Sequence, residues 1–280
     1  MFEDLKKELD KKPFLTSRDE IIPHLSTLLK KAIQMKGKVG IAFSGGVDSS
    51  VMALLAPKKI LYSVGLQNSS DLDWAVQASM KMDWPLKCKL LSVQEAEEII
   101  ENVVRILTEH DVDTNVTNVG VACVVYAVLE MAKKDKINTV YGGLGAEEIF
   151  GGYRRHVDYG ENYEQQHIHQ RLWEGLFGLE ERDIKRDTAI AQHFKINLVA
   201  PFLNKELVTY AMQIDPLLKI TPKKKKIIFR ETAISLGLPT EFAQRKKVAA
   251  QYGSKFDRVM LRLAKKKGFK QKKEYITSLQ

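Results

Sequence analysis

The chain has 280 residues, of which 44% are hydrophobic and 28% are charged, an ordinary composition for a folded protein with ample core material. A surplus of 44 Lys and Arg over 35 Asp and Glu gives a net charge of +9, which suits an anionic partner such as a nucleotide. No stretch approaches the run of about eighteen apolar residues that a membrane span needs, and the N-terminus mixes acids with lysines. We therefore expect neither a membrane span nor a secretory signal peptide, and a cytoplasmic location.

A helix leads into a region where strands and helices alternate. Apolar residues recur at helical spacing from Ile21 to Met35, and Gly37 follows as a helix-ending residue. The segment Val39–Phe43 is short, apolar and rich in β-favouring residues, as a strand buried on both faces is. By the same criteria we expect strands at 60–64, 86–91 and 139–141, and helices at 49–56, 72–82, 93–109 and 119–134.

Strand signals fade after Gly152, and helical patterns follow at 161–177, 180–193, 203–213, 223–236 and 252–266. The alternation predicts an α/β fold on a parallel sheet with helices on both faces, in which ligands bind beyond the carboxyl ends of the strands. We expect residues 1–36 to form a helical N-terminal extension, 37–153 the nucleotide-binding α/β core, and 154–280 a mostly helical C-terminal part. Because no linker separates the last two, we expect them to pack closely.

A glycine-rich loop, Ser44–Ser49, directly follows the first predicted strand and opens a helix. Gly45 and Gly46 let the backbone approach an anion closely, and N–H groups at the helix start point at that anion. The hydroxyls of Ser44 and Ser49 can donate hydrogen bonds to phosphate oxygens. A tight turn is the simpler explanation, but strand, loop and helix follow one another in the order that an anion-binding loop requires.

Asp48 lies within that loop and would repel a bare phosphate. We explain it as a ligand of Mg²⁺ that bridges the phosphates, with an acid that stabilises the helix N-terminus as the alternative. The loop is not a Walker loop, which needs a Lys before its last Ser or Thr. It resembles the pyrophosphate loop (PP-loop) of the ATP pyrophosphatases, Ser-Gly-Gly-x-Asp-Ser, a family that cleaves ATP to AMP and pyrophosphate.

A second glycine-rich segment begins with Gly142 and Gly143, directly after the last predicted strand. Glycines permit close backbone approach, and Glu147 and Glu148 then begin a helical stretch. Two adjacent carboxylates near an anion loop suit a Mg²⁺ site shared with Asp48. Stabilisation of a helix N-terminus is the alternative for the two glutamates.

The segment from Gly142 to Tyr153 resembles the Ser-Gly-Glu-Gly-Ser-Asp-Glu-Leu-Phe-Gly-Gly-Tyr signature of the asparagine synthetase family, in its synthetase domain. The resemblance runs from about Val39 to Gly253 and implies an adenine nucleotide alpha hydrolase-like fold. Further pieces agree in order along the chain: Ser63–Leu66 with Asp71, Glu109–Val112, Pro201–Asn204, Arg230, Leu238-Pro239 and Arg245–Lys247.

The resemblance implies an AMP-forming, ATP-dependent amide ligase. A carboxylate attacks the α-phosphate of ATP to give an acyl-adenylate and Mg-pyrophosphate, and an amine then displaces AMP. ATP and Mg²⁺ are the cofactors so implied, and a small carboxylate with ammonia or another amine are the substrates. Asparagine synthesis is the nearest named activity.

By position, the resemblance assigns nucleotide binding to residues that offer hydroxyls, backbone groups or an acid: Ser44, Gly45, Gly46, Asp48, Ser49, Val64, Gly142 and Gly143. It places the backbone of Val64 at adenine and Gly143 beside the ribose and α-phosphate.

The resemblance also assigns the metal and the chemistry. Asp48 and Glu147 hold the metal. Glu147 replaces an Asp of the family and keeps its negative charge on a side chain that is one methylene longer. Catalytic roles fall to Glu147, Glu148 and Lys247, where the lysine stabilises charge on the reacting α-phosphate. A surface lysine is the alternative reading of Lys247.

The resemblance weakens where the acyl substrate should bind. Leu144 stands where the signature has Glu, and Val116 replaces an Arg that holds the substrate aspartate. Asn197 and Val199 replace a Glu and an Arg before the Pro-Phe-Leu motif. An α-carboxylate needs a cation and an α-ammonium needs a carboxylate, so the amino-acid half is altered while the ATP half is kept.

The chain starts with Met1-Phe2, without the nucleophilic Cys that begins the family's glutaminase domain. We therefore expect ammonia from solution or from a separate glutaminase subunit, or a different amine. Two other functions stay open. The basic tail favours a nucleic-acid partner, and hence an enzyme that adenylates a tRNA base, although few aromatics interleave with its lysines. Leu144 favours an inactive regulator that binds ATP or AMP.

Overall fold

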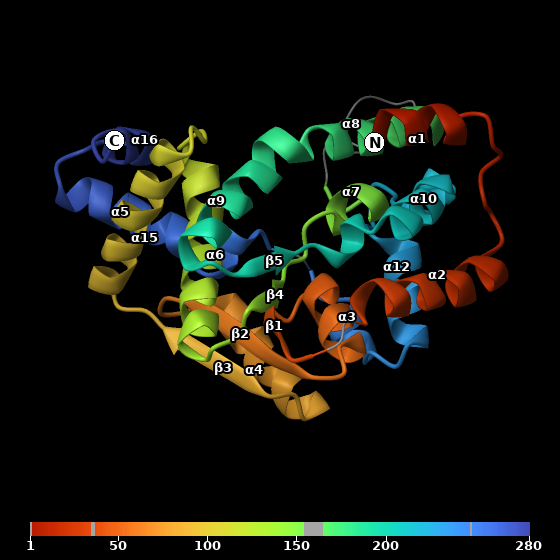
Figure 1. The fold of residues 1–280 in the computed structure, drawn as a ribbon, viewed down its shortest axis with the longest axis horizontal. Coiled ribbons are helices and arrows are strands. Elements are labelled where there is room, and N and C mark those ends of the chain that lie inside the picture. The colour runs from red at the N-terminus through yellow and green to blue at the C-terminus, as the bar shows by residue number, and fades with distance from the viewer. Residues whose placement is uncertain (1, 35–36, 154–164, 247) are drawn as a thin grey trace.

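A five-stranded parallel sheet forms the centre of the computed structural model, which describes residues 2–34, 37–153, 165–246 and 248–280. Its strand order is β3-β2-β1-β4-β5 (Figure 1). Residues of β1 pair with both neighbours, so that Gly40 lies opposite Ile60 and Val140. The strand bounds are β1 (Val39–Ala42), β2 (Lys59–Gly65), β3 (Leu86–Leu90), β4 (Thr139–Tyr141) and β5 (Asn197–Val199).

The four strands predicted from the sequence are confirmed, but β5 was missed. It has only three residues, none of them fully buried, and it pairs with β4 alone at the edge of the sheet, with Leu198 opposite Val140. A strand this short carries no period-2 pattern that could be recognised. The sheet therefore receives its last strand from the region that the sequence predicted to be helical.

Helices cover both faces of the sheet, as predicted. They are α1 (Phe2–Leu9), α2 (Arg18–Ile33), α3 (Val47–Leu55), α4 (Ser70–Met82), α5 (Val93–Glu109), α6 (Val116–Lys134), α7 (Ala146–Phe150), α8 (Gln165–Phe177), α9 (Lys185–Phe194), α10 (Lys205–Gln213), α11 (Pro216–Lys219), α12 (Ile227–Ser235), α13 (Thr240–Ala243), α14 (Ala250–Gly253), α15 (Phe256–Lys266) and α16 (Lys272–Thr277). A π-helix, η2 (Glu180–Ile184), leads into α9, and a 3-10 turn, η3 (Pro201–Leu203), follows β5.

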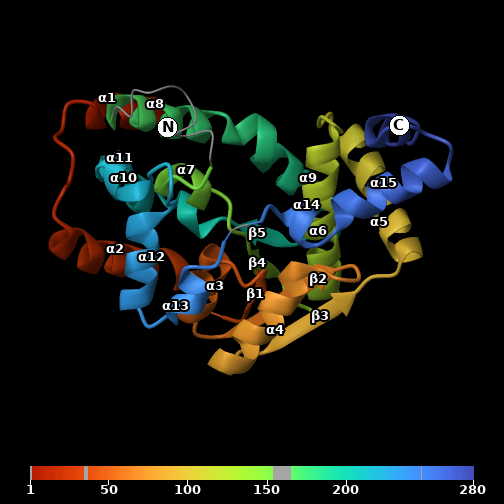
Figure 2. The same cartoon turned by 180° about the vertical axis from the view of Figure 1, so that it is seen from behind.

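Two hydrophobic cores form on opposite faces of the sheet because successive strand residues point in opposite directions. In β2, Leu61 joins one core and Tyr62 the other; in β4, Tyr141 and Val140 divide in the same way. The first core contains residues of α2, α3 and α12, and α13 packs against α3 (Figure 2). The second contains residues of α5, α6 and α15.

Helix α6 is the one helix among the described residues that is long and apolar enough to cross a membrane by length and composition. Its most apolar window has a mean hydropathy of 1.4, and 56% of that window is buried inside the fold. It packs against α5, α9 and β2. This is how a core helix of an α/β sheet behaves, so the finding is weak evidence for a membrane.

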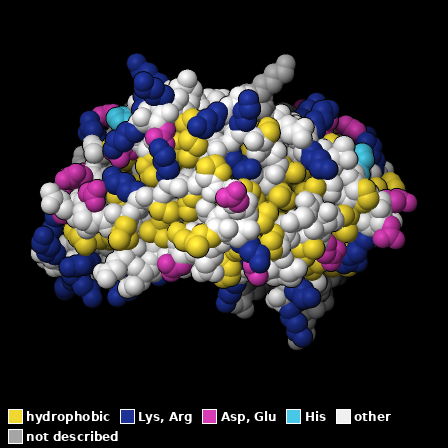
Figure 3. All heavy atoms as spheres, turned by 90° about the horizontal axis from the view of Figure 1, so that it is seen from below, with side chains coloured by type: hydrophobic (Ala, Val, Ile, Leu, Met, Phe, Trp, Pro, Cys, Tyr) yellow, Lys and Arg dark blue, Asp and Glu magenta, His cyan; other side chains and the backbone are white. Residues whose placement is uncertain are grey.

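The edge strand β3 and the neighbouring α4 leave apolar side chains on the surface. Both elements lie at the bottom of Figure 1, and the face seen from below shows hydrophobic side chains across its middle with Lys and Arg around them (Figure 3). Val76, Met80 and Leu90 are 41%, 79% and 66% exposed. Nothing in this surface contacts the cavity described next.

Candidate active site

A cavity of about 300 Å³ lies at the carboxyl ends of β1, β2 and β4, where ligands of parallel sheets bind. It brings together most of the candidate residues predicted from the sequence: Ser44, Gly46, Asp48, Ser49, Val64, Gly142, Gly143, Glu147 and Glu148. Gly45 lies in the same loop without lining the cavity, and Lys247 lies outside the described residues.

The loop after β1 has the form of an anion site. Gly46 caps the N-terminus of α3, and the Ser49 hydroxyl donates a hydrogen bond to the Gly46 carbonyl at 3.1 Å. Gly45 has a φ of +71°, and a Cβ there would lie 2.8 Å from the backbone of Trp74, so only glycine fits. The first residues of α3, at the positive end of the helix dipole, therefore line the cavity.

A buried lysine binds both acids that the sequence assigned to the metal. Lys226 Nζ donates to Asp48 Oδ1 at 2.6 Å and to Glu147 Oε1 at 2.8 Å, and the lysine is 1% exposed. A Cβ on Gly152 would come within 1.5 Å of Glu147 Oε2, so glycine is required there for the pair to form. Burial lowers the pKa of Lys226, and the Asp48 carboxylate opposes that shift. We call these three charged residues the Lys226 cluster.

Sequence reasoning missed Lys226 because it ends the run Lys223–Lys226, which was interpreted as a solvated face. Lys223 and Lys224 are exposed, but the last lysine of the run turns inward beside the buried start of α12. The signal was indirect: two acids predicted to meet in a dry site require a cation.

Two arginines add positive charge to the same cavity. Arg245 donates to the carbonyl of Ser44, and its Nη2 donates to Asp71 Oδ1 at 2.7 Å. Arg230 donates to the carbonyl of Ala243 and, at 3.1 Å, to that of Arg245. Burial lowers the pKa of Arg230. Arg245 thus ties the loop of residues 44–49 to the segment before Lys247, and Arg230 fixes that segment to α12.

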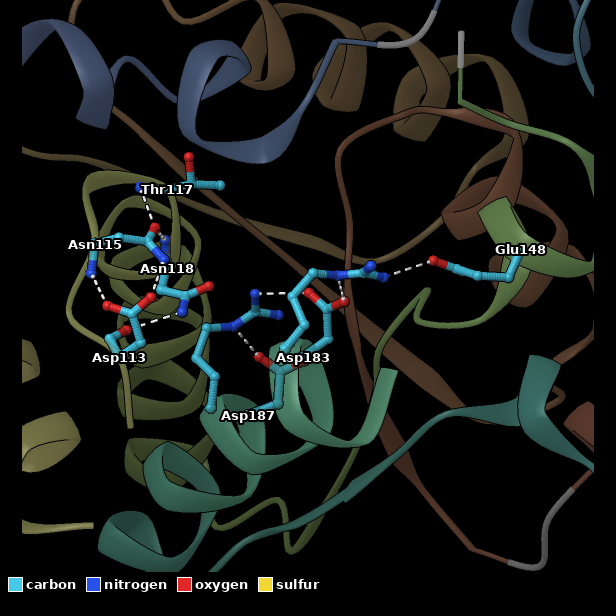
Figure 4. A network of polar contacts seen from close by, with 9 residues as sticks. Asp113, Asn115, Thr117, Asn118, Glu148, Asp183 and Asp187 are labelled. Atoms are coloured by element: carbon cyan, nitrogen blue, oxygen red, sulfur yellow. Dashed lines mark hydrogen bonds and ion pairs between the residues drawn. The ribbon is translucent and has the colours of Figure 1, made fainter. Parts of the chain in front are cut away.

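A second charge cluster lines the same cavity where η2 meets α9 (Figure 4). Arg186 donates from Nη1 to Asp183 Oδ1 and from Nε to Asp187 Oδ1, both at 2.8 Å. These three residues are the Arg186 cluster. Arg182 connects it to α7, since it donates to Asp183 at 2.5 Å and to Glu148 Oε1 at 3.0 Å. Burial raises the pKa of Asp187, with Arg186 opposing the shift.

The two adjacent glutamates of α7 therefore face different partners. Glu147 contacts the cation beside Asp48, whereas Glu148 contacts Arg182 and is 1% exposed. Burial raises the pKa of Glu148, and Arg182 opposes that shift more than Lys226 does.

Three of the four positions that depart from the family signature share one pocket. Leu144, Asn197 and Val199 line a cavity between α9 and β5, and Leu144 also lines the central cavity. Val116 packs against the core that contains α5 and α6.

The residues present fit a divalent ion in part. Among the described residues no group of three or more His, Cys, Asp or Glu side chains could hold a metal. Asp48 and Glu147 nevertheless converge on one point, since one oxygen of each lies within 2.8 Å of the same nitrogen. Mg²⁺ is commonly bound by one or two carboxylates together with substrate phosphates. The pair suits such an ion when phosphates complete its shell.

A known protein family and solved structures resemble this chain. A family model described as asparagine synthase matches residues 24–166 and 160–275. A putative glutamine-hydrolysing asparagine synthetase 1 of Methanocaldococcus jannaschii is 31% identical over 296 residues, 92% of this chain and 54% of that protein. Asparagine synthetase B of Escherichia coli is 25% identical over 253 residues, 83% of this chain and 44% of that protein. The chain thus spans about half the length of these relatives.

A solved structure described as a predicted subunit of tRNA methyltransferase, also from Methanocaldococcus jannaschii, covers 62% of this chain and 73% of its own. Its sequence identity is 16% and its TM-score 0.30, a likeness too distant to bear on the site.

Proposed function

This chain belongs to the asparagine synthase family, and from that premise we propose that it is a cytoplasmic ATP-dependent ligase that adenylates a carboxylate and transfers the acyl group to an amine. One observation supports the proposal: the N-terminus of α3 and three cations, Lys226, Arg230 and Arg245, line one cavity at the carboxyl ends of the strands. Such a site favours the triphosphate of ATP and the negative charge that develops as pyrophosphate leaves.

The proposed reaction has two steps. A carboxylate oxygen forms a bond to the α-phosphorus while the bond from that phosphorus to the bridging oxygen of pyrophosphate breaks, and the electron pair leaves with pyrophosphate. The amine nitrogen then forms a bond to the acyl carbon while the bond from that carbon to the AMP oxygen breaks. The nitrogen loses one proton, and the products are an amide, AMP and pyrophosphate.

Within this proposal each part of the cavity has a role. The loop around Ser44, Gly46 and Ser49 binds the pyrophosphate portion, with Arg245 holding the loop in place. The backbone of Val64 would contact adenine, and Gly143 would lie by the ribose and α-phosphate; both line the cavity with Gly142, and a Cβ on Gly143 would be 3.6 Å from Asp48 Cβ.

The charged residues of the proposal supply the electrostatics. Asp48 and Glu147 would hold Mg²⁺, which lends positive charge to the phosphates when bound. Lys226 fixes both carboxylates before nucleotide arrives and shares their negative charge. Lys247 keeps its proposed role at the reacting α-phosphate.

An exchange assay tests the proposal. Purified protein with Mg²⁺, ATP, labelled pyrophosphate and single carboxylic acids, aspartate first, should move label into ATP only when the correct acid is present. Asp48→Asn should lower the exchange about 100-fold or more, because it removes a charge that organises the phosphate site. Asp73→Asn, which changes an exposed acid of α4, is the matched control. ATP binding without exchange for any acid would favour the regulator over the ligase.

The amine of the second step is proposed to be ammonia, from solution or a separate glutaminase subunit, or an organic amine. Once an acid supports exchange, release of AMP in the presence of different amines decides between them.

A second candidate function, adenylation of an RNA base, is favoured by one observation. Residues 250–280 hold nine Lys and Arg against two Asp and Glu, a net +7 of the chain's +9. On α15, Arg258, Arg262, Lys265 and Lys266 are exposed and form no ion pair with any residue that the structure describes. Changing these four to Glu should flatten the salt dependence of tRNA binding if RNA is the substrate. Wild-type binding that is weak and insensitive to salt would remove this candidate.

A further inference from the structure

A groove of about 590 Å³ lies between α9 and β5, on the outer side of the central cavity. The two spaces share a wall, because four residues line both of them: Gly142, Leu144, Asp187 and Leu198. Toward the surface the groove is lined by exposed polar residues, among them Thr188 and Gln192. The groove therefore lies between solvent and the central cavity, with the four shared residues as the partition.

The shared wall is apolar except at one position. Leu144 and Leu198 supply aliphatic surface, and Gly142 has no side chain, so that a Cβ there would already touch Leu198 Cδ1 at 3.7 Å. Asp187 is the one charged residue that both spaces share. An aliphatic group with a positive end would match both features of this wall.

The Asp187 carboxylate has an incomplete set of hydrogen-bond partners. Three carboxylates, those of Glu148, Asp183 and Asp187, face two guanidiniums, those of Arg182 and Arg186. Arg186 Nε occupies only Oδ1 of Asp187, and Oδ2 has no partner among the residues that the structure describes. A half-buried carboxylate with one free oxygen favours a cation that can donate hydrogen bonds, and the cation that lines the groove itself, Lys195, is exposed.

We propose that this groove admits the second substrate as an organic primary amine, and that Asp187 binds its ammonium group and accepts one proton from it, which leaves a neutral amine nitrogen to attack the acyl carbon. The proposal deepens the ligase function and rests on it. The aliphatic body of the amine lies against Leu144 and Leu198. At the position of Leu144 the family signature has a glutamate. Arg186 acts as a positioning residue, because its hydrogen bond holds the Asp187 carboxylate at the wall. The pKa of Asp187, raised by burial, agrees with a carboxylate that lacks a full set of cationic partners.

A binding experiment that needs no acyl substrate tests this. n-Butylammonium is the probe, with 1-butanol and butyrate as neutral and anionic analogues of equal length, and affinities are measured by calorimetry or ligand-observed NMR. Wild-type protein should bind butylammonium about tenfold or more tightly than either analogue, and Asp187→Asn should remove about that factor. Glu180→Gln, an exposed acid of η2 outside both cavities, is the matched control and should bind as wild type does.

Thr188→Trp provides a variant that leaves all charges in place. The indole should narrow the groove, weaken butylammonium binding and raise the KM for bulky amines, with little effect on kcat or on ammonia. This variant decides the matter if Asp187→Asn fails to fold. Equal binding of butylammonium and butanol, or no effect of either change, would overturn the proposal.

Pyrophosphate exchange, measured on the same protein preparations, distinguishes failure of the ligase function from failure of the amine site alone. Exchange precedes amine binding, so the control variant Glu180→Gln, which lies outside both cavities, should retain it. Absence of exchange in the wild type with every acid would defeat the ligase function. Exchange together with unselective amine binding would defeat only the amine site.

Discussion

The two buried charge clusters of this protein have the same composition, one cation between two carboxylates, but the chain builds them in different ways. The Lys226 cluster joins three distant segments, with Asp48 and Lys226 178 positions apart. The Arg186 cluster lies within five consecutive positions at the start of one helix. A local cluster can form as soon as its helix does, whereas the long-range cluster exists only when sheet, α7 and α12 are all in place.

This difference predicts that the Lys226 cluster serves function and the Arg186 cluster serves stability. Gathering three buried charges from distant segments into one cavity costs desolvation free energy that apolar residues would not cost. Such a group therefore suggests a site that works on charged ligands. The Arg186 cluster shares the cavity but is held by its own helix, so we expect its first contribution to be to the structure of α9. Substitutions in each cluster can test this division.

Lys226→Met should have the largest effect and act on activity. It removes a cation from the phosphate site and leaves two carboxylates facing each other, so the rate of acid-dependent pyrophosphate exchange should fall about 1000-fold. Lys223→Met, which changes an exposed lysine of the same run, should leave the rate unchanged. A rate for Lys226→Met within threefold or so of wild type would mean that the long-range cluster is structural after all.

Arg186→Met should instead act on stability. It leaves Asp183 and Asp187 buried without their shared cation, which typically costs about 3–4 kcal/mol in the free energy of unfolding. Urea denaturation measures this value. The exchange rate at temperatures where the variant is folded should stay near the wild-type rate. A loss of exchange in the folded variant would erase the distinction between the clusters.

Lys219 is a buried cation outside both clusters and serves as a reference that forms no ion pair among the described residues. It is fully buried, and its Nζ forms no hydrogen bond within the described residues. Burial lowers the pKa of Lys219 from 10.5 to about 7. The unfolded chain therefore binds more protons between pH 7 and 10.5, so wild-type stability should rise with pH across that window.

Lys219→Met should remove this penalty. We expect the variant to be more stable than wild type at pH 7 by about 2 kcal/mol, less than the full shift implies because the lysine's surroundings relax. The gain should shrink as the pH approaches 10.5. Thermal unfolding of both proteins at pH 7 and pH 10 measures the two differences. A pH-independent difference would show that the lysine finds a partner in solution.

The sequence predicted the fold, and it predicted which residues of the loop after β1 and of the segment after β4 meet in one cavity, because both depend on local patterns. Strand, glycine loop and helix around Ser44 are contiguous, so their order alone indicated an anion site. The cation at Lys226 depends on a chain reversal far along the sequence, and a run of four lysines has no pattern that tells the buried one from the exposed ones. Strand β5 and the wall at Asp187 arise from packing of α9 on the sheet edge, which periodicity does not encode.

Substitution of Arg182 should have the smallest effect, and it tests whether the two clusters form one network. It joins Glu148 to Asp183, but its side chain is 36% exposed, so solvent screens the pair. Arg182→Met should cost less than about 1 kcal/mol of unfolding free energy, and should leave the activity defect of Lys226→Met unchanged in the double variant. Glu147 and Glu148 would then divide α7 between two independent tasks. A coupling above about 1 kcal/mol would instead mean that charge at α9 is felt at the phosphate site, and that an amine bound at Asp187 could influence nucleotide binding across α7.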